Sequence, residues 1–145
     1  MERAVRGRSH GPGGVAWLRL ARVFGKIDRL SAAHLARWNL SVAQFDVLVQ
    51  VGATPGLTQQ DVADALLVTK GNISQLIDRM ARDGLLLRVK EGRLKRLSLT
   101  ERGQALYDVV TPAQEGFIAA RFAALAPTDQ RELLRLLRLL DHALH

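Results

Sequence analysis

The chain of 145 residues contains no cysteine. This absence excludes a disulfide framework, a metal site built from thiolates and a redox sensor that works through cysteine. The chain also lacks any run of about 18 apolar residues, the length that a membrane-spanning helix needs. Its basic N-terminus leads into Gly-Pro-Gly-Gly and then into apolar patches that Arg19, Arg22 and Lys26 interrupt, a pattern unlike a secretory signal. We therefore expect a cytoplasmic protein that does not bind a membrane.

Arrangements of side chains suited to catalysis or metal binding are equally scarce. The sequence shows no set of nucleophile, base and acid, and no phosphate-binding loop. His34, His142 and His145 do not form the dense cluster of ligands that a metal site requires. The sequence therefore predicts a protein that is not an enzyme and that uses neither a metal nor a cofactor.

Positive charge is concentrated in two segments of the chain, whose net charge is +7. Residues 1–29 contain seven basic and two acidic residues, and residues 69–103 contain nine and four. Segregated basic charge is typical of a protein that binds a polyanion, although an Arg-rich surface that only maintains solubility would give the same distribution. Apolar residues make up 48% of the chain, enough for the core of one domain. We interpret residues 1–13 as a flexible basic arm that precedes this domain.

Hydrophobic spacing and capping residues predict a mainly α fold with one short β-hairpin. The expected helices cover about 15–38, 41–52, 58–66, 69–84, 101–124 and 127–145, and the expected strands cover 86–89 and 94–99. Ser41, Thr58 and Thr69 are residue types that cap helix N-termini, and Gly84 is a typical C-cap. Pro112 predicts a kink in the fifth helix. The third and fourth helices together with the hairpin predict a winged helix-turn-helix.

The helix expected over 69–84 has one apolar and one polar face. The apolar arc consists of Ile73, Leu76, Ile77 and Met80, and the opposite arc of Gly71, Ser74, Gln75, Asp78 and Arg82. Small residues allow close approach to a major groove, where Asn72, Ser74 and Gln75 can form hydrogen bonds with base edges. Lys70 and Arg79 can bind phosphates. The alternative is an ordinary surface helix with a solvated polar face.

The hairpin is strongly basic. It contains Arg88, Lys90, Arg93, Lys95 and Arg96 with a single acid, Glu91. We expect Glu91 and Gly92 to form a two-residue turn, which would place Lys90 opposite Arg93 and Arg88 opposite Lys95. Like charges across a ladder destabilise it, and a polyanion along the hairpin would remove that penalty. The alternative is an edge ribbon that its Lys and Arg side chains keep soluble.

A set of motifs, in this order and at this spacing, resembles the MarR family of transcription regulators. They are QFDVL at 44–48, LTQQDVA at 57–63, VTKGNIS at 68–74, DRM at 78–80, DGLL at 83–86 and LTERG at 99–103. The resemblance extends from about residue 15 to the end of the chain. It implies one domain over 14–145, with a winged-helix DNA-binding part at 41–100 and N- and C-terminal dimerisation helices at 14–38 and 101–145.

The resemblance also implies an obligate homodimer bound to a pseudo-palindromic operator in double-stranded DNA. The recognition helix would enter the major groove, and the wing would reach the minor groove. The DNA-binding residues expected from the resemblance and from the chemistry above are Thr58, Gln59, Thr69, Lys70, Asn72, Ser74, Gln75, Arg79, Arg88, Lys90, Arg93, Lys95 and Arg96. Glu91-Gly92-Arg93 stands where the family has an Asp-x-Arg motif, and this wing is shorter than usual. Arg93 therefore either reaches the minor groove or contacts only phosphates.

Both ends of the chain are rich in apolar residues, independently of the resemblance. The last helix carries a leucine stripe that consists of Leu133, Leu136, Leu137, Leu140 and Leu144, widened by Leu134 and Leu139. Trp17, Leu18 and Phe24 add apolar surface near the N-terminus. Such patches are a liability when exposed, and pairing across a two-fold axis would bury them. The alternative is packing within one chain.

Many family members release DNA when a small, often aromatic, ligand fills the crevice between the dimerisation helices and the DNA-binding part. The resemblance thus implies a possible small aromatic effector. Trp17, His34 and Trp38 are candidates for binding it, with ordinary packing as the alternative. The expected function is that of a homodimeric, sequence-specific repressor released by a ligand. The competing hypothesis is a winged-helix interaction module whose basic wing binds an acidic protein.

Overall fold

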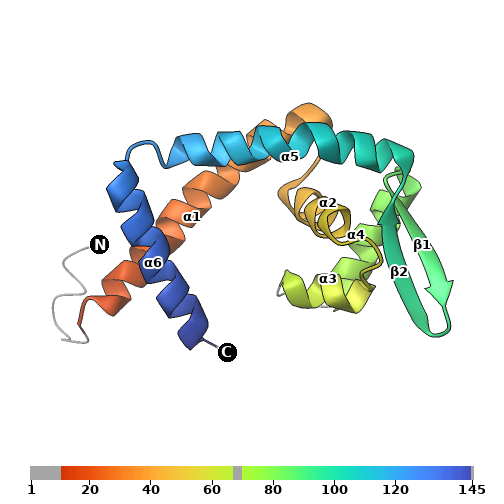
Figure 1. The fold of residues 1–145 in the computed structure, drawn as a ribbon, viewed down its shortest axis with the longest axis horizontal. Helices are drawn as coiled ribbons and strands as arrows, with labels where there is room; N and C mark the ends of the chain where they lie inside the picture. Colours follow the sequence, from red (N-terminus) through yellow and green to blue (C-terminus); the bar gives the residue numbers. More distant parts are fainter. Residues whose placement is uncertain (1–10, 67–69, 145) are drawn as a thin grey trace.

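The computed structural model describes residues 11–66 and 70–144, and their fold is mainly helical with one antiparallel hairpin, as predicted. The elements are α1 (Gly13–Leu35), the 3-10 turn η2 (Ala36–Trp38), α2 (Val42–Ala53), α3 (Gln59–Ala65), α4 (Lys70–Arg82), β1 (Leu86–Glu91), β2 (Leu94–Leu99), α5 (Glu101–Arg121) and α6 (Pro127–Ala143). Figure 1 shows α2, α3, α4 and the hairpin gathered at one end of the molecule. We call this unit, residues 41–100, the head. The basic arm expected at 1–13 lies mostly outside the described residues.

Side-chain caps start the helices of the head where the sequence predicts them. The Ser41 hydroxyl accepts a hydrogen bond from the Gln44 amide (3.1 Å), and the Gln44 side chain accepts one from the Ser41 amide (2.9 Å). Thr58 and Asp61 form the same reciprocal box at 3.0 Å in both directions. Each box satisfies amide groups that a helix N-terminus leaves without partners. The cap predicted at Thr69 lies outside the described residues.

The core lies where α2, α4 and the hairpin meet the middle of α5. Its fully buried side chains include Leu48 of α2, Ile77 of α4, Leu97 of β2 and Val110 of α5. The apolar arc predicted for α4 therefore faces inward. Gly103 of α5 packs so closely on the backbone carbonyl of Leu85 that a Cβ atom would not fit there. This contact sets α5 directly against the start of the hairpin.

Two helix ends differ in detail from the expectation. The helix predicted over 15–38 ends as α-helix at Leu35 and continues as η2, which stops at Asn39 in the left-handed conformation (φ 56°). The helix α5 ends at Arg121, short of the predicted residue 124, and continues through Pro112 as one helix. Gly84 follows α4 with φ +77°, the left-handed conformation expected of a C-cap glycine.

The predicted turn of the hairpin is wrong by one residue, and each cross-strand partner is therefore shifted by two. Glu91 pairs with Leu94, so Gly92 and Arg93 form the turn, and Lys90 faces Lys95. Gly92 has φ +64°, and a glycine with positive φ at the first turn position suits a type II′ hairpin. Arg88 consequently faces Leu97 rather than Lys95. One like-charge pair remains across the ladder.

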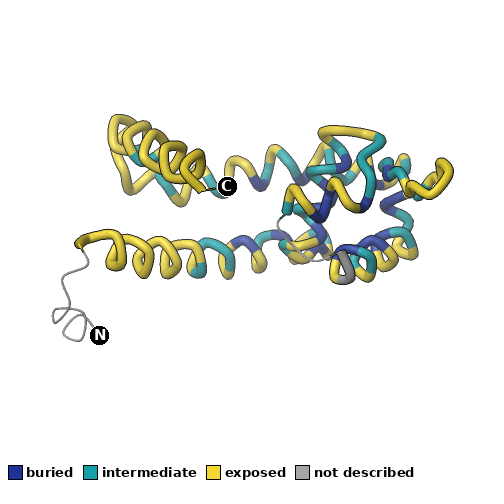
Figure 2. The backbone as a smooth tube through the Cα atoms, turned by 90° about the horizontal axis from the view of Figure 1, so that it is seen from below, coloured by how far each residue is buried: buried dark blue, intermediate teal, exposed yellow. Residues whose placement is uncertain are grey.

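Two segments project away from the head. They are the N-terminal half of α1 (Gly13–Phe24) and α6, which we call the arms. Every residue of the first arm is exposed, and α6 contains no buried residue (Figure 2). The arms cross in Figure 1 but lie apart in Figure 2. In the part of the chain that the structure describes, no helix combines the length and apolar character needed to span a membrane.

Candidate nucleic-acid interface

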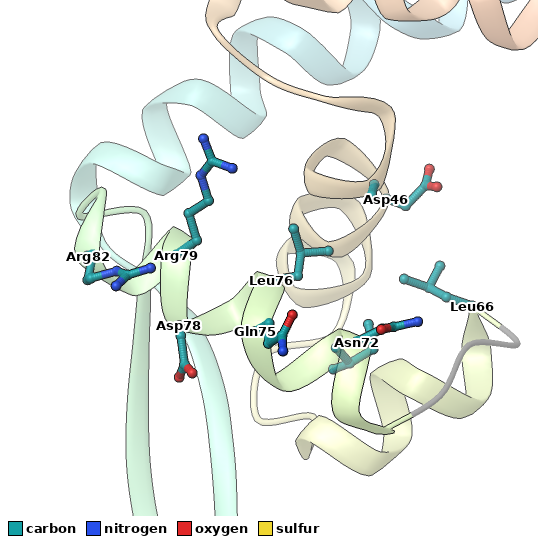
Figure 3. A pocket seen from close by; sticks show the side chains of 10 residues that line it. Asp46, Leu66, Asn72, Gln75, Leu76, Asp78, Arg79 and Arg82 are labelled. Carbon is teal, nitrogen blue, oxygen red and sulfur yellow. The ribbon is translucent and has the colours of Figure 1, made fainter.

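The helix α4 presents polar side chains along its outer side. Asn72, Gln75 and Arg79 are exposed and recur at helical spacing, which places them on one face. They line a groove of about 720 Å³ that Asp46 of α2 also borders. Figure 3 shows these side chains along α4, with Asp46 on the neighbouring helix. Amide and guanidinium groups arranged in this way can form hydrogen bonds with base edges and phosphates.

The structure describes the start of α4 only in part. Thr69 lies outside the described residues, and Lys70 is the first residue of α4 but its side chain is not described. Ser74 is half-buried, and its carbonyl oxygen lies 3.4 Å from a guanidinium nitrogen of Arg88. Of the residues predicted to read DNA, Asn72, Gln75 and Arg79 are therefore the ones that the structure presents on the open side of α4.

Two arginines predicted to contact DNA are directed toward the protein itself. Arg88 of β1 forms an ion pair with Asp78 on α4. Arg96 of β2 donates to the carbonyl of Gly56 (3.0 Å) and forms an ion pair with Glu91. These guanidinium groups fasten the wing to the head. Their predicted contact with DNA stays a prediction. Counting charges along the sequence could not reveal these partners, because they depend on the register and on the packing of α4.

The wing is joined to the head by its backbone as well. Arg96 forms an isolated antiparallel bridge with Thr58, and the amide of Leu97 donates to the carbonyl of Leu57 (2.8 Å). The amide of Gly56 in turn donates to the carbonyl of Leu97 (2.9 Å). The segment before α3 thus acts as a short third strand. These bonds limit how far the wing can move relative to α4.

Three cations remain at the outer end of the hairpin. Lys90, Arg93 and Lys95 are exposed, and none of them forms a salt bridge with a described residue. We call them the wing tip. Lys90 and Lys95 face each other across the ladder, where their like charges oppose pairing. A polyanion beside the wing tip would relieve that repulsion.

The remaining two predicted contacts lie at the start of α3 and serve the fold. Gln59 is 8% exposed, and its side-chain carbonyl oxygen is buried without a hydrogen-bond partner among the described residues. Gln59 is thus buried in the head, and its predicted contact with DNA stays a prediction. The hydroxyl of Thr58 is occupied by the capping box, whose hydrogen bonds also lower the pKa of Asp61.

Comparison with known proteins identifies the lineage of this chain. The profile of the MarR family matches residues 38–96, which include the helices of the head and most of the wing. An HTH-type transcriptional regulator of Bacillus cereus is 34% identical over 122 residues, covering 84% of this chain and 83% of the relative. The chain belongs to the MarR family. It is a DNA-binding transcription regulator of the winged helix-turn-helix type.

Solved structures related to this MarR chain share its fold. The MepR–DNA complex of Staphylococcus aureus has a TM-score of 0.80 at 20% identity, covering 88% of this chain and 96% of that one. A MarR family protein of Mycobacterium tuberculosis in complex with salicylic acid has a TM-score of 0.68 at 27% identity, covering 83% and 92%.

The structure brings together only two of the three residues proposed to bind a ligand. Trp17 lies on an arm and is 66% exposed. His34 stacks on Phe117 with ring centres 4.2 Å apart and meets the Trp38 ring edge-on at 5.1 Å. The Nδ1 atom of His34 also lies 2.7 Å from Oε1 of Gln114. His34 and Trp38 therefore have well-defined packing roles at the junction of α1 and α5.

The structure has two cavities that α5 borders. One of about 520 Å³ is lined by Trp38 together with Arg82 and Arg102. The other, of about 550 Å³, lies between α1, α2 and α5 and includes Asp28 and Asp46. Their walls come from helices far apart in the chain, so spacing within one helix gives no sign of them. The second cavity occupies the crevice between the long helices and the head.

Proposed function

We propose that this MarR regulator is a homodimeric repressor that binds a pseudo-palindromic operator in a sequence-specific manner. The observation that carries the proposal is the rigid link between the exposed face of α4 and the cationic wing tip. The ion pair of Asp78 with Arg88 joins the two elements, so a groove contact by Gln75 and a backbone contact by Arg93 would be made together. Occupying an operator is sufficient to exclude a polymerase from it.

The exposed apolar arms support a homodimer. Trp17 is 66% exposed and Leu139 is 60% exposed, and the described part of the chain leaves both side chains largely uncovered. A self-complementary interface across a two-fold axis would bury the arms of both copies at once. It would also present two copies of α4 to half-sites about 34 Å apart, which explains why the operator should be palindromic.

The cavity between α1, α2 and α5 supports ligand-controlled release as part of this proposal. A molecule lodged between α1, α2 and α5 would contact both the dimerisation helices and the head. If it binds more tightly when the spacing of the two heads does not match the operator, it shifts the population away from the DNA-bound form. The related M. tuberculosis protein in complex with salicylic acid supports the idea of a small-molecule effector.

The decisive experiment is binding of the purified protein to its own upstream intergenic DNA at two salt concentrations. A scrambled duplex of equal length is the control, and light scattering gives the mass of the free protein. If the wing tips of a dimer contact six phosphates, the logarithm of the affinity should fall with the logarithm of salt concentration with a slope of about −5. Palindrome-dependent binding by a dimer is the expected result. Equal, weak binding to both duplexes would contradict the proposal and favour an acidic protein as the partner of the wing.

A further inference from the structure

The cavity between α1, α2 and α5 has the size of a small-molecule site. Its volume of about 550 Å³ falls within the range of roughly 300 to 1,000 Å³ that is usual for ligand pockets. Most of its wall is apolar, with Phe24 from α1, Phe45 and Val49 from α2 and Ile118 from α5. A hydrocarbon or aromatic body would therefore be accepted in its interior.

The charged side chains of this wall are all acidic. Each of the three helices contributes one carboxylate, namely Asp28 from α1, Asp46 from α2 and Glu115 from α5. None of the described residues that line the cavity is basic. Nor does any described residue form a salt bridge with one of these three carboxylates. The negative charge of the cavity is thus not balanced by the described part of this chain.

This arrangement is unfavourable for the protein alone. Burial raises the pKa of Asp46, and the nearby charge of Asp28 raises it further. Both effects oppose ionisation, and an opposite charge beside a half-buried carboxylate favours its charged form. A positively charged group in the cavity would supply that partner. An anionic group would instead meet like charges on every side.

One uncharged polar atom in the wall also lacks a partner. The hydroxyl of Thr111 on α5 is buried and forms no hydrogen bond with a described residue. The neighbouring polar side chains are already engaged, because Gln114 donates to Ser31 (3.1 Å) and contacts His34 (2.7 Å). An N–H group of a ligand could donate to the Thr111 hydroxyl, which adds a directional contact to the charge interaction.

We propose that this cavity binds a small apolar cation, such as an amine or a quaternary ammonium compound that carries an aromatic or alkyl group. The apolar wall would hold the body of the ligand, and the three carboxylates would hold its charge. The role of this ligand as the effector rests on the proposed release from DNA, whereas its binding does not. This charge selection distinguishes the cavity from one that accepts an aromatic acid.

The test uses three probes with nearly the same body and different end groups. Phenylbutylamine is a cation at neutral pH, phenylbutanol is neutral and phenylpentanoate is an anion. Isothermal titration into the full chain without DNA measures each affinity directly. We expect the amine to bind at least about tenfold more tightly than the alcohol, and the acid to bind more weakly than both.

Variants of the cavity identify the source of this preference. Asp28→Asn combined with Glu115→Gln keeps the size of the side chains and removes two charges, and should weaken amine binding about tenfold while leaving the alcohol unchanged. Asp46 is left in place because it also borders the groove beside α4. Asp108→Asn, on the exposed side of α5 outside the cavity, is the matched control and should bind the amine normally. Thermal unfolding confirms that each variant is folded.

The outcomes separate this proposal from the proposed function. Absence of amine binding, or equal binding of amine and acid, would overturn the inference. So would a double variant that binds the amine as tightly as the original chain does. Operator binding is measured on the same preparation by fluorescence anisotropy. An amine that binds selectively to a protein with no affinity for an operator would support the cavity assignment and contradict only the repressor function.

Discussion

The head and the arms differ in the burial of their apolar residues. In the head, Leu48 of α2 and Ile77 of α4 are fully buried, and each packs in a core that one chain completes. In the arms, Trp17 and Leu139 are exposed. No described residue of α1 up to Phe24 is buried, and neither is any residue of α6. Both regions are rich in apolar residues, so composition does not distinguish them. The difference indicates that the head completes its core with α5 and the end of α1 of the same chain, whereas the arms need a partner to cover them.

The same contrast applies to polar groups. The ion pairs that involve Arg88 and Arg96 hold the wing on the head, and the wing tip carries charges without partners in the described chain. In α6 the one ion pair of the described residues joins Arg135 to Glu132 within the same helix. We therefore expect changes in the arms to act on assembly, and changes in the head to act on folding and on DNA binding.

The largest effect should come from a charge placed on the leucine stripe of α6. Leu137→Glu would bury one uncompensated carboxylate per copy in the proposed interface, at a cost of roughly 3–5 kcal/mol each. Light scattering should then report monomers. Arg131→Glu, on the opposite side of the same helix, is the matched control and should remain dimeric. A dimeric Leu137→Glu protein would place the interface elsewhere.

The next effect concerns the core of the head. Leu48→Ala should lower the free energy of unfolding by about 2–5 kcal/mol, because it removes a buried side chain and leaves a cavity. Urea denaturation provides the measurement. Leu87→Ala, at an exposed position on β1, should change this free energy by less than about 0.5 kcal/mol. Equal losses in the two variants would contradict the separation of a packed core from an open surface.

A smaller effect is expected on the reading face of α4. Gln75→Ala should cost about 1–3 kcal/mol of operator binding and relax the preference at the base that it contacts. Selection of binding sites from randomised duplexes shows whether the preferred motif changes. Gln104→Ala, on α5 away from this face, controls for the loss of an exposed glutamine. An unchanged motif would mean that another face of α4 reads the DNA.

The wing tip should act on affinity without affecting base preference. Arg93→Ala and Lys95→Ala should each weaken binding to operator and random duplexes alike, and lower the salt slope of the dimer by about 2 because two phosphate contacts are lost. Titrations at several salt concentrations measure this slope. A loss confined to the operator would indicate instead that Arg93 reads the minor groove. Arg131→Ala, a cation of the arm, should leave the slope unchanged.

The smallest effect concerns Asp46. Its pKa is raised above the ordinary value of 3.8 by burial and by the nearby charge of Asp28. The folded chain therefore holds this proton more tightly than the unfolded chain does, and stability falls as the pH rises from that value through the folded-state pKa. Asp46→Asn cannot ionise, so its melting temperature at neutral pH should be slightly higher than that of the original chain. The difference should vanish at pH about 3, where both forms are neutral. A constant difference at all pH values would contradict this origin.

Local chemistry allowed much of the fold to be predicted. The caps at Ser41 and Thr58, the left-handed Gly84 and the inward arc of α4 all depend on residues within a few positions of one another. Such interactions can be predicted from spacing alone. The turn of the hairpin was misplaced by one residue, because a glycine can occupy either turn position. The cross-strand partners consequently differ from the predicted ones by two positions.

The sequence by itself determined that this chain is a mainly helical MarR protein with a basic wing and apolar ends, since these features are local patterns of residue type. Only the tertiary structure decided which cations of the wing have partners within the chain, because the partner of Arg88 lies on α4 and that of Arg96 lies in the loop before α3. It alone also brought together Asp28, Asp46 and Glu115 in one cavity. These three residues are distant in the chain, and the packing of the helices places them around the same cavity.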